Sequence, residues 1–252
     1  MSSILGVPVD AAYHLVSGFT ILLTPALGGV AAVAAIVLFT AAARLILMPL
    51  SLRGLRGQAT QARLAPQLQD LRKRYAKQPE RLQREMTALY KREGTSMFAG
   101  LTPLLLQWPL LSVMYLLFRS TQIGGKPNTL LTHDLFGVPL GSHWLAAAGP
   151  VSLHGLVFLG VFALLAGLCW LSVRLGRLMT AQSAGADAPG GALIRVLPYL
   201  TVVIAAFVPL AAGIYLLTST GWALAERSFF WRTGRISGAA PTPQKPAVAA
   251  RN

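Results

Sequence analysis

Long apolar runs alternate with short polar segments along most of the chain. Three of these runs are each long enough for one membrane-spanning helix: residues 29–50, 98–118 and 151–173. A helix needs about 20 apolar residues to cross the roughly 30 Å hydrocarbon layer. A fourth block, residues 193–231, contains the break Pro209-Leu-Ala-Ala-Gly213 near its middle. Because this block is long enough for two short tilted helices joined by a turn, the pattern predicts five spans.

The segment before the first run has apolar residues at helical spacing. Val9, Tyr13, Val16 and Leu23 recur on one face, with polar residues such as Asp10 between them. A helix with one apolar and one polar face lies in the membrane interface rather than across it. We therefore expect residues 1–27 to be an extracytoplasmic N-terminus with a short interfacial helix that ends at Pro25.

Residues 53–93 carry a different pattern, with apolar residues at spacings of three and four. They are Leu64, Leu68, Leu71 and Tyr75, and then Leu82, Met86 and Leu89 after Gln78-Pro79. Proline suits the first turn of a helix, so Pro79 marks the start of a second helix. The pattern predicts a helical hairpin, an antiparallel coiled coil of about three layers. So short a seam is marginally stable, and we expect the hairpin to be mobile.

Composition supports a membrane protein. Apolar residues make up 54% of the 252 residues and charged residues 12%, about half the charged share of a soluble domain. Eight acidic residues cannot supply a soluble protein's charged surface. The expected fold class is therefore an all-α integral membrane protein with five transmembrane helices, an N-terminal interfacial helix and a cytoplasmic hairpin. The single cysteine, Cys169, excludes a disulfide framework and a thiolate zinc site.

The distribution of Lys and Arg predicts the orientation. Of the 22 basic residues, 11 lie in residues 53–92 and only Arg119 and Lys126 lie in the 119–150 loop. Basic loops stay in the cytoplasm, so the N-terminus and the 119–150 loop are expected outside. The five-span core would cover residues 28–232, with a second cytoplasmic loop at 174–194. Residues 233–252, rich in Ala and Pro, are expected to be a disordered cytoplasmic tail.

Arg44 is the one basic residue expected inside a span. It precedes Arg53 by nine residues, about 13 Å of helix, and the interval is mostly apolar. An arginine near the centre of the bilayer costs roughly 2.5 to 3.5 kcal/mol on translocon scales. All eight carboxylates are expected in loops, near span ends or in the N-terminal helix, so we expect Arg44 to face a hydrated cavity. The alternative is that its side chain snorkels to the cytoplasmic interface.

Neutral polar side chains within the spans are candidates for lining that cavity. They are Thr40, Thr102, Gln107, Ser112, Tyr199, Thr201, Tyr215 and Thr218. For the Ser and Thr residues taken singly, packing between helices is the alternative role.

Residues 53–93 carry 11 basic residues against four acidic ones, and nine of the basic residues are expected on the exposed face of the hairpin. The candidate docking residues are Arg72, Lys73, Arg74, Lys77, Arg81 and Arg84. One interpretation is a solvated face whose charge sets the topology. The other is a docking surface for anionic lipids, ribosomal RNA or a targeting factor.

Four segments together resemble the YidC/Oxa/Alb family of membrane protein insertases. They are the intramembrane arginine stretch at residues 41–52, the hairpin motifs at 71–75 and 89–94, Gly100-Leu-Thr-Pro-Leu-Leu-Leu-Gln-Trp-Pro109, and Pro209-Leu-Ala-Ala-Gly-Ile-Tyr215. The resemblance covers about residues 25–232. It implies a bacterial multi-pass plasma membrane protein whose positively charged groove opens to the cytoplasm and to lipid, with Arg44 as the groove arginine.

The resemblance also implies partners. Nascent membrane proteins would be the substrates, and anionic lipids, the ribosome, the signal recognition particle receptor and the Sec translocon are further expected partners; DNA is not. No cofactor and no metal ion are expected.

Two other functional classes are an enzyme and a transporter. No metalloprotease, serine hydrolase or P-loop motif is present in the sequence, which argues against an enzyme. His133, Asp134 and His143 could bind a metal ion, but solvation in the loop is the favoured interpretation. The main alternative function is a small transporter or channel for an anionic solute, with Arg44 as the binding charge.

Overall fold

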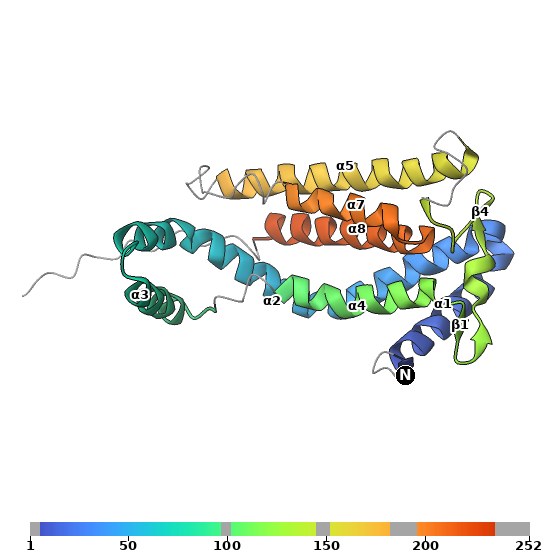
Figure 1. Cartoon of the computed structure of the whole chain (residues 1–252), viewed down its shortest axis with the longest axis horizontal. Helices are drawn as coiled ribbons and strands as arrows, with labels where there is room; N and C mark the ends of the chain where they lie inside the picture. The colour runs from blue at the N-terminus through green and yellow to red at the C-terminus, as the bar shows by residue number, and fades with distance from the viewer. Residues whose placement is uncertain (1–5, 97–101, 145–151, 182–195, 235–252) are drawn as a thin grey trace, which may run out of the picture.

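The computed structural model describes residues 6–96, 102–144, 152–181 and 196–234, and these are mostly helical (Figure 1). The α-helices are α1 (Gly6–Leu27), α2 (Ala31–Arg74), α3 (Pro79–Arg92), α4 (Thr102–Arg119), α5 (Leu153–Ala181), α7 (Leu200–Phe207) and α8 (Leu210–Arg232). The 3₁₀ helices are η1 (Gly28–Val30), η3 (Thr129–Thr132) and η5 (Leu197–Tyr199). The four strands are β1 (Gln122–Ile123), β2 (Lys126–Pro127), β3 (Asp134–Leu135) and β4 (Val138–Pro139).

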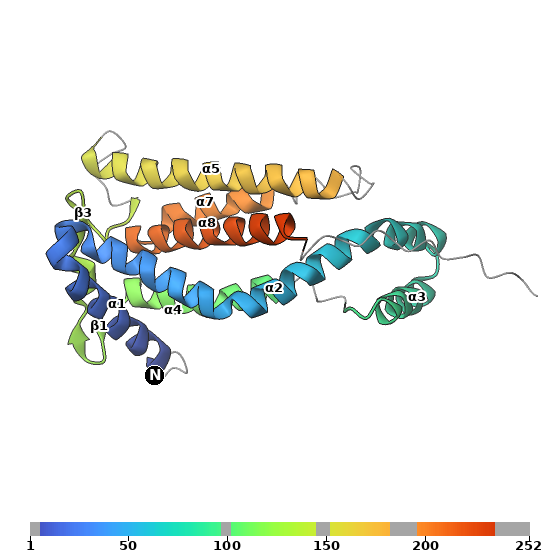
Figure 2. The same cartoon turned by 180° about the vertical axis from the view of Figure 1, so that it is seen from behind.

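The helices form an elongated bundle in which α8 lies between α5 on one side and α2 and α4 on the other (Figures 1 and 2). The end of the bundle that carries β1–β4 is called the strand end here, and the end that carries α3 is called the hairpin end. Every residue from Leu210 to Leu216 is buried. A helix that is buried all round occupies the centre of its bundle. The first two turns of α8 are therefore surrounded by the other helices and the loop at the strand end.

By length and composition alone, two stretches of the described chain are apolar enough to cross a membrane, Gly6–Arg74 and His154–Arg177. A shorter apolar helix covers Trp108–Arg119. These findings agree with a helical membrane protein.

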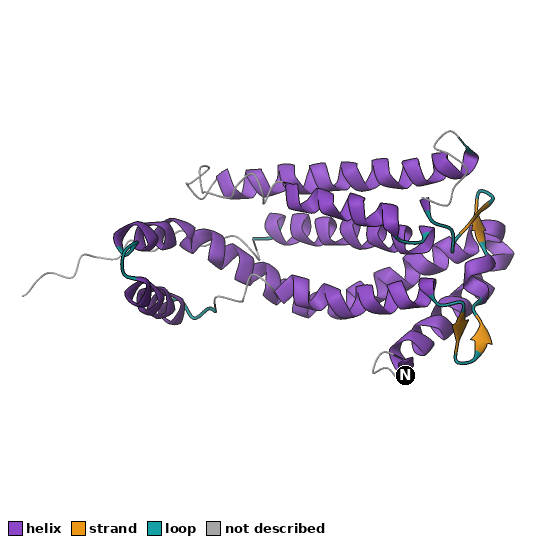
Figure 3. Ribbon diagram, viewed as in Figure 1, coloured by secondary structure: helices purple, strands orange, loops and turns teal. Residues whose placement is uncertain are grey.

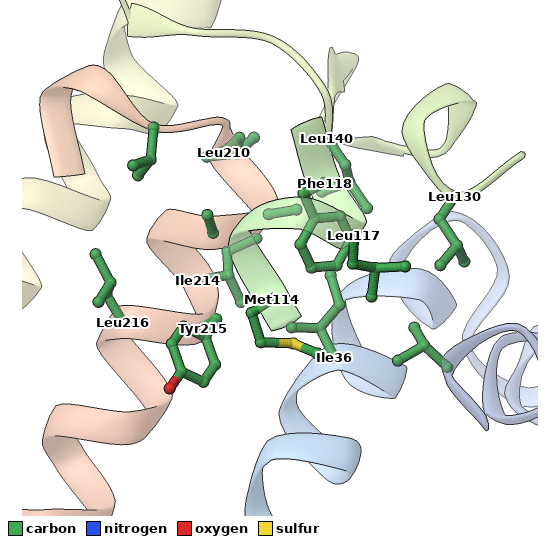
Figure 4. Packing of buried hydrophobic residues seen from close by; sticks show 14 of the residues in the cluster. Ile36, Met114, Leu117, Phe118, Leu130, Leu140, Leu210, Ile214, Tyr215 and Leu216 are labelled. Carbon is green, nitrogen blue, oxygen red and sulfur yellow. The ribbon is translucent and has the colours of Figure 1, made fainter. Parts of the chain in front are cut away.

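The apolar core is concentrated near the strand end, where α2, α4 and α8 meet the loop between α4 and α5. Figure 4 shows the buried side chains there: Ile36, Met114, Leu117, Phe118, Leu130, Leu140, Leu210, Ile214, Tyr215 and Leu216. The loop contributes directly to this cluster through Leu130 and Leu140. The packing therefore holds the loop against the helix ends that it connects.

Helix α1 buries the face that the sequence pattern marked. Val9, Ala12, Val16 and Thr20 are buried, and α1 packs on α2 and α4. The expected end at Pro25 is two residues too early, because α1 continues through that proline to Leu27. Gly28, with a φ of +54°, then starts the 3₁₀ turn that leads into α2.

Helix α2 is longer than the sequence pattern indicated. The first apolar run and the first hairpin helix form one helix of 44 residues, about 66 Å long at 1.5 Å per residue. Pro49 and Pro66 both lie within it. The expected break at Gln78-Pro79 coincides with the start of α3.

The two hairpin helices face each other across an open cleft. The cleft, of about 300 Å³, is lined by α2 residues that include Leu71 and by α3 residues that include Leu89, both half-buried. Both leucines were expected to pack as coiled-coil layers. An ion pair between Arg63 of α2 and Glu93, just after α3, links the two hairpin segments at their end nearer the bundle.

The expected break in the last apolar block is present: α7 ends at Phe207 and α8 begins at Leu210. The first amide groups of a helix have no partner within that helix. In α8 the loop between α4 and α5 supplies acceptors for two of these amides, since the Leu210 amide donates to the Ser142 carbonyl at 2.9 Å and the Ala211 amide donates to the Leu140 carbonyl at 3.0 Å. The loop thus caps α8.

The loop between α4 and α5 contains two small β-hairpins that the sequence pattern did not predict. β1 pairs with β2 and β3 with β4, both antiparallel, and the strands lie at one end of the bundle (Figure 3). Buried Asn128 joins this loop to α4. Its side-chain amide donates to the Leu117 carbonyl at 2.6 Å and to the Ser120 carbonyl at 2.9 Å, and its carbonyl accepts from the Leu130 amide.

Candidate functional site

Arg44 lies on α2 between two apolar stretches, and its side chain is half-buried. Its Nη2 donates to the hydroxyl of Ser219 on α8. Arg44 follows the start of α2 by 13 residues and Ser219 precedes the end of α8 by 13 residues. The guanidinium therefore meets a partner well inside both helices rather than at the hairpin end, which argues against simple snorkelling.

The contacts between α2 and α8 follow a constant offset. Arg44 pairs with Ser219, Ser51 pairs with Glu226, and each pair is separated by 175 residues. Leu55 and Phe230, which share the same separation, form a small buried cluster farther along. Residues seven apart lie on the same face of a helix, so α2 and α8 run parallel with a coiled-coil register.

Glu226 is a buried polar residue that sequence reasoning did not single out. It is only 6% exposed, and it lies inside α8, six residues before the helix ends. This position agrees with the expectation that the carboxylates lie in loops, near span ends or in the N-terminal helix, but the burial of the side chain was not expected. Its Oε2 accepts from the Ser51 hydroxyl at 2.6 Å, and its Oε1 accepts from Trp222 Nε1 at 2.9 Å.

Several predicted lining residues lie near Arg44, but their hydroxyl groups are already used as donors. Thr40 is buried one turn before Arg44 and donates to the Ile36 carbonyl at 2.7 Å. Thr218 donates to the Ile214 carbonyl at 2.9 Å. Such bonds to the preceding turn are typical of Ser and Thr within helices. Each hydroxyl oxygen still has lone pairs to offer a donor.

The other candidates are spread over four elements. Tyr215, on α8 one turn before Ser219, is fully buried in the apolar cluster (Figure 4). Ser112 is half-buried on α4, and Tyr199 and Thr201 are half-buried on η5 and α7. The side chains of Thr102 and Gln107 lie outside the described residues. The structure thus groups Thr40 and Arg44 with the α8 residues, while Tyr199 and Thr201 belong to the segment that packs on α5.

The predicted docking residues are exposed at the hairpin end. Arg72, Lys73 and Arg74 form the last turn of α2, where basic side chains interact favourably with the helix dipole. The remaining members are Lys77, Arg81 and Arg84, all exposed. The Arg81 guanidinium lies 5.1 Å from the centre of the Tyr75 ring. The Arg84–Glu80 pair, at 3.9 Å, is highly exposed and contributes little to stability.

The residues considered for a metal site do not converge. Among the residues that the structure describes, no group of three or more His, Cys, Asp or Glu side chains could hold a metal ion. His143 pairs with Pro209 in an isolated β-bridge, and the Asp134 carboxylate accepts from the Gly137 amide at 2.9 Å. Both residues thus take part in the structure of the loop between α4 and α5.

Comparison with known proteins places these features in a family. The model of the family described as "60Kd inner membrane protein" matches residues 23–236. The membrane protein insertase YidC of Clostridium tetani is 38% identical over 101 residues, which cover 40% of this chain and 46% of that protein. The YidC of Granulibacter bethesdensis is 30% identical over 164 residues, covering 63% and 26%, respectively.

A third relative is the YidC of Helicobacter pylori, 35% identical over 102 residues that cover 40% of this chain and 19% of that protein. The chain spans less than half the length of each of these relatives. The family match nevertheless extends from α1 to just beyond α8 and includes Arg44 and Glu226. This chain therefore belongs to the 60Kd inner membrane protein family, the YidC/Oxa group that its sequence motifs resemble.

Proposed function

We propose that this protein is a membrane protein insertase. It takes the hydrophilic segment of a nascent membrane protein into a positively charged groove that opens to the cytoplasm, and it releases the substrate's helix into lipid. It forms and breaks no covalent bond. The proposed topology has five spans, with the N-terminus outside and the hairpin and C-terminus in the cytoplasm of a bacterial cell.

The observation that carries this proposal is the contact between Arg44 and Ser219 inside two apolar helices. A guanidinium presents five N–H donors and no acceptor, so the hydroxyl of Ser219 is one of several acceptors that it can bind. A backbone carbonyl or carboxylate of a polar substrate segment offers the same chemistry. Arg44 can therefore bind such a segment at a depth where lipid offers no polar partner.

The energetic benefit of this arrangement goes to the substrate. A polar segment that enters hydrocarbon alone loses its hydrogen bonds to water, at several kcal/mol for each unsatisfied group. A fixed positive charge and hydroxyl groups at mid-depth replace part of that hydration. The barrier to crossing falls, while the cost of burying Arg44 has already been met when this protein folds.

The groove is proposed to be lined by Arg44, Thr40, Ser112, Thr218 and the other predicted polar residues. Release into lipid needs an apolar exit beside it. Trp108 on α4 is 65% exposed, and Leu111 on the same helix is half-buried. These two side chains supply an apolar surface along which a substrate helix can move out of the groove.

The exposed basic residues of the hairpin are proposed to receive the substrate or its carrier. Anionic lipid headgroups are attracted to such residues by about 1 kcal/mol per charge near the surface. The ribosome, the signal recognition particle receptor and the Sec translocon are further proposed partners. The charge on Arg72, Lys73 and Arg74 and their position in the last turn of α2 support a docking role.

Site-specific photocrosslinking during synthesis tests the proposal. Probes at Ser112 and Thr218, which are half-buried on α4 and α8, should capture a single-span substrate. A control probe at Leu164, which is exposed on α5, should capture lipid. Equal capture at all three positions, or lipid alone at the first two, contradicts the groove. Anion flux through the purified protein in liposomes would instead favour the transporter.

A further inference from the structure

The turn between β3 and β4 has an unusual backbone. Phe136 has a φ of +52° and Gly137 a φ of +79°. Only a few per cent of non-glycine residues adopt this left-handed region, and bulky side chains do so least often. Phe136 is the only non-glycine residue with a positive φ in the parts of the chain described here. The sequence thus has phenylalanine where asparagine or glycine would be the usual choice.

The ring of Phe136 is exposed although the loop that carries it contributes to the apolar core. Phe136 is 70% exposed, whereas Val138 and Leu140 are fully buried in the apolar cluster. Two further contacts fix the turn: the Gly137 amide donates to Asp134 Oδ2 at 2.9 Å, and the Gly137 carbonyl lies 3.1 Å from His154 Nε2. A well-anchored turn therefore projects one large apolar side chain away from the protein.

The contact with His154 places this turn beside the start of α5, whose outer face is apolar. Leu156, Leu159, Leu164, Trp170 and Leu171 are exposed at helical spacing, while Phe158, Val161, Leu165 and Cys169 are buried on the opposite face. An exposed apolar stripe along a helix that is long enough to span a membrane is the surface that faces lipid. The Phe136 turn lies at one end of this stripe.

The length of α5 gives the depth of that end. Arg174 is exposed, and its guanidinium lies 5.2 Å from the centre of the Trp170 ring, a combination typical of a membrane interface. His154 precedes Arg174 by 20 residues, about 30 Å of helix, which matches the thickness of the hydrocarbon layer. His154, and with it the Phe136 turn, therefore lies at the opposite boundary of that layer.

We propose that Phe136 is a lipid anchor: its ring inserts into the outer boundary of the bilayer, where it extends the lipid-facing stripe of α5. This inference rests on the membrane-spanning arrangement proposed for α5. Lipid accounts for both observations, since it covers the exposed ring and offsets the unfavourable backbone conformation. A protein partner would have to dock on a surface that already adjoins the acyl chains.

The anchor has a structural consequence for the groove. The same loop caps α8 through the carbonyls of Leu140 and Ser142. A loop held at fixed depth by Phe136 holds the first turn of α8 at that depth too, and Ser219 lies nine residues farther along α8. The lipid contact therefore helps to set the level at which Ser219 meets Arg44.

Spin-label accessibility in reconstituted protein measures the depth directly. Cys169 is the only cysteine, so a Cys169→Ala background accepts single labels. We expect a label at Phe136→Cys to collide with oxygen more than with a water-soluble nickel complex, as a shallow membrane site does. Leu164→Cys serves as the membrane reference and Arg72→Cys as the aqueous reference. Accessibility at 136 equal to that of the aqueous reference overturns the anchor.

An aqueous result at Leu164→Cys as well would instead contradict the proposed span of α5, so the two failures are distinguishable. Neither measurement depends on insertase activity. The label at 136 is itself partly apolar, and a second comparison therefore uses unlabelled side chains.

Amide hydrogen exchange in lipid nanodiscs distinguishes anchoring of the Phe136 ring in lipid from the backbone preference of residue 136. Phe136→Asn suits the left-handed conformation better but removes the apolar ring, whereas Phe136→Trp keeps an interfacial aromatic. If lipid anchors the turn, exchange in residues 134–140 becomes about tenfold faster in Phe136→Asn and stays within twofold of the native rate in Phe136→Trp. Unchanged or slower exchange in Phe136→Asn means that the more favourable backbone conformation of asparagine outweighs the loss of the ring, and the proposal is overturned.

Discussion

The hydrogen bond between Ser51 and Glu226 is expected to couple α2 and α8 energetically. Glu226 is 6% exposed and accepts from Ser51 at 2.6 Å and from Trp222 at 2.9 Å. A hydrogen bond to a charged group contributes about 1.5–3 kcal/mol in soluble proteins, and pairs within membranes are generally weaker, at most about 1.7 kcal/mol. Ser51→Ala should therefore destabilise the native protein by about 1–1.7 kcal/mol.

The informative quantity is the dependence of that loss on Glu226. In a Glu226→Met background the acceptor is absent, so Ser51→Ala should cost less than in the native protein, by more than the roughly 0.5 kcal/mol by which independent sites depart from additivity. Glu226→Met alone is less decisive, because replacing a buried charge with an apolar side chain of similar size is often neutral or stabilising. Reversible unfolding in mixed micelles, or steric trapping in bicelles, supplies the four free energies of unfolding.

Ser228→Ala is the matched control. Ser228 lies two residues from Glu226, but its hydroxyl donates to the Leu224 carbonyl of its own helix at 2.8 Å. Its removal should cost the same amount in both backgrounds. If Ser51→Ala also costs the same in both backgrounds, the bond does not couple the helices and the reasoning is refuted.

Three further predictions concern the proposed groove, the hairpin and the loop between α4 and α5. Arg44→Ala should reduce insertion of substrates with charged segments at least tenfold in a depleted host, whereas Arg44→Lys keeps the charge and most of the activity; normal insertion by Arg44→Ala would refute the charge argument. Neutralising Arg72, Lys73 and Arg74 together should weaken binding to anionic liposomes by about 1 kcal/mol per charge at low salt, an effect that high salt should abolish; liposome flotation measures it. Asn128→Ala leaves two buried carbonyls without donors and should lower the free energy of unfolding by about 1–3 kcal/mol, which thermal unfolding in detergent would detect or contradict.

Features that depend on the local pattern of residues could be predicted from the sequence. The apolar runs, the start of α3 at Pro79 and the break before Leu210 all depend on residues close together in the chain. The family followed from several motifs in a fixed order. Arg44 stood out because a charge within an apolar run is rare.

Features set by contacts between distant segments were not accessible. Thr218 was a candidate and Ser219 was not, yet only the register of α2 against α8 decides which of the two hydroxyls faces Arg44. The hydroxyl that donates to buried Glu226 belongs to Ser51, which lies 175 residues away in the sequence. The two-residue strands are too short to produce an alternating pattern.

The continuity of α2 was missed for a different reason. Charged residues from Arg53 onward mark the expected membrane boundary, but a helix satisfies its own backbone hydrogen bonds in water and in lipid alike. A change of solvent therefore need not end a helix. Pro49 does not end the helix either. Proline removes one backbone hydrogen bond, and within a helical bundle neighbouring groups can satisfy the carbonyl that is left without a donor.

The seam between α2 and α8 joins these observations into one physical picture. Its two polar contacts, at Arg44 and at Glu226, lie between the apolar cluster at the strand end and the small Leu55–Phe230 cluster at the hairpin end. Apolar contacts in a membrane tolerate sliding, because lipid is as apolar as the facing helix. Polar contacts do not, since a shift of one residue would separate both pairs at once.

Under the proposed function, the positions of these polar and apolar contacts determine how a substrate reaches Arg44. A polar group of the substrate can take the place of the Ser219 hydroxyl, which exchanges one hydrogen bond for another at little net cost. The Ser51–Glu226 bond and the Leu55–Phe230 contact lie farther toward the hairpin end and are not disturbed by that exchange. Arg44 can therefore change partners while α2 and α8 stay in register, so the groove accepts a substrate without the two helices having to separate.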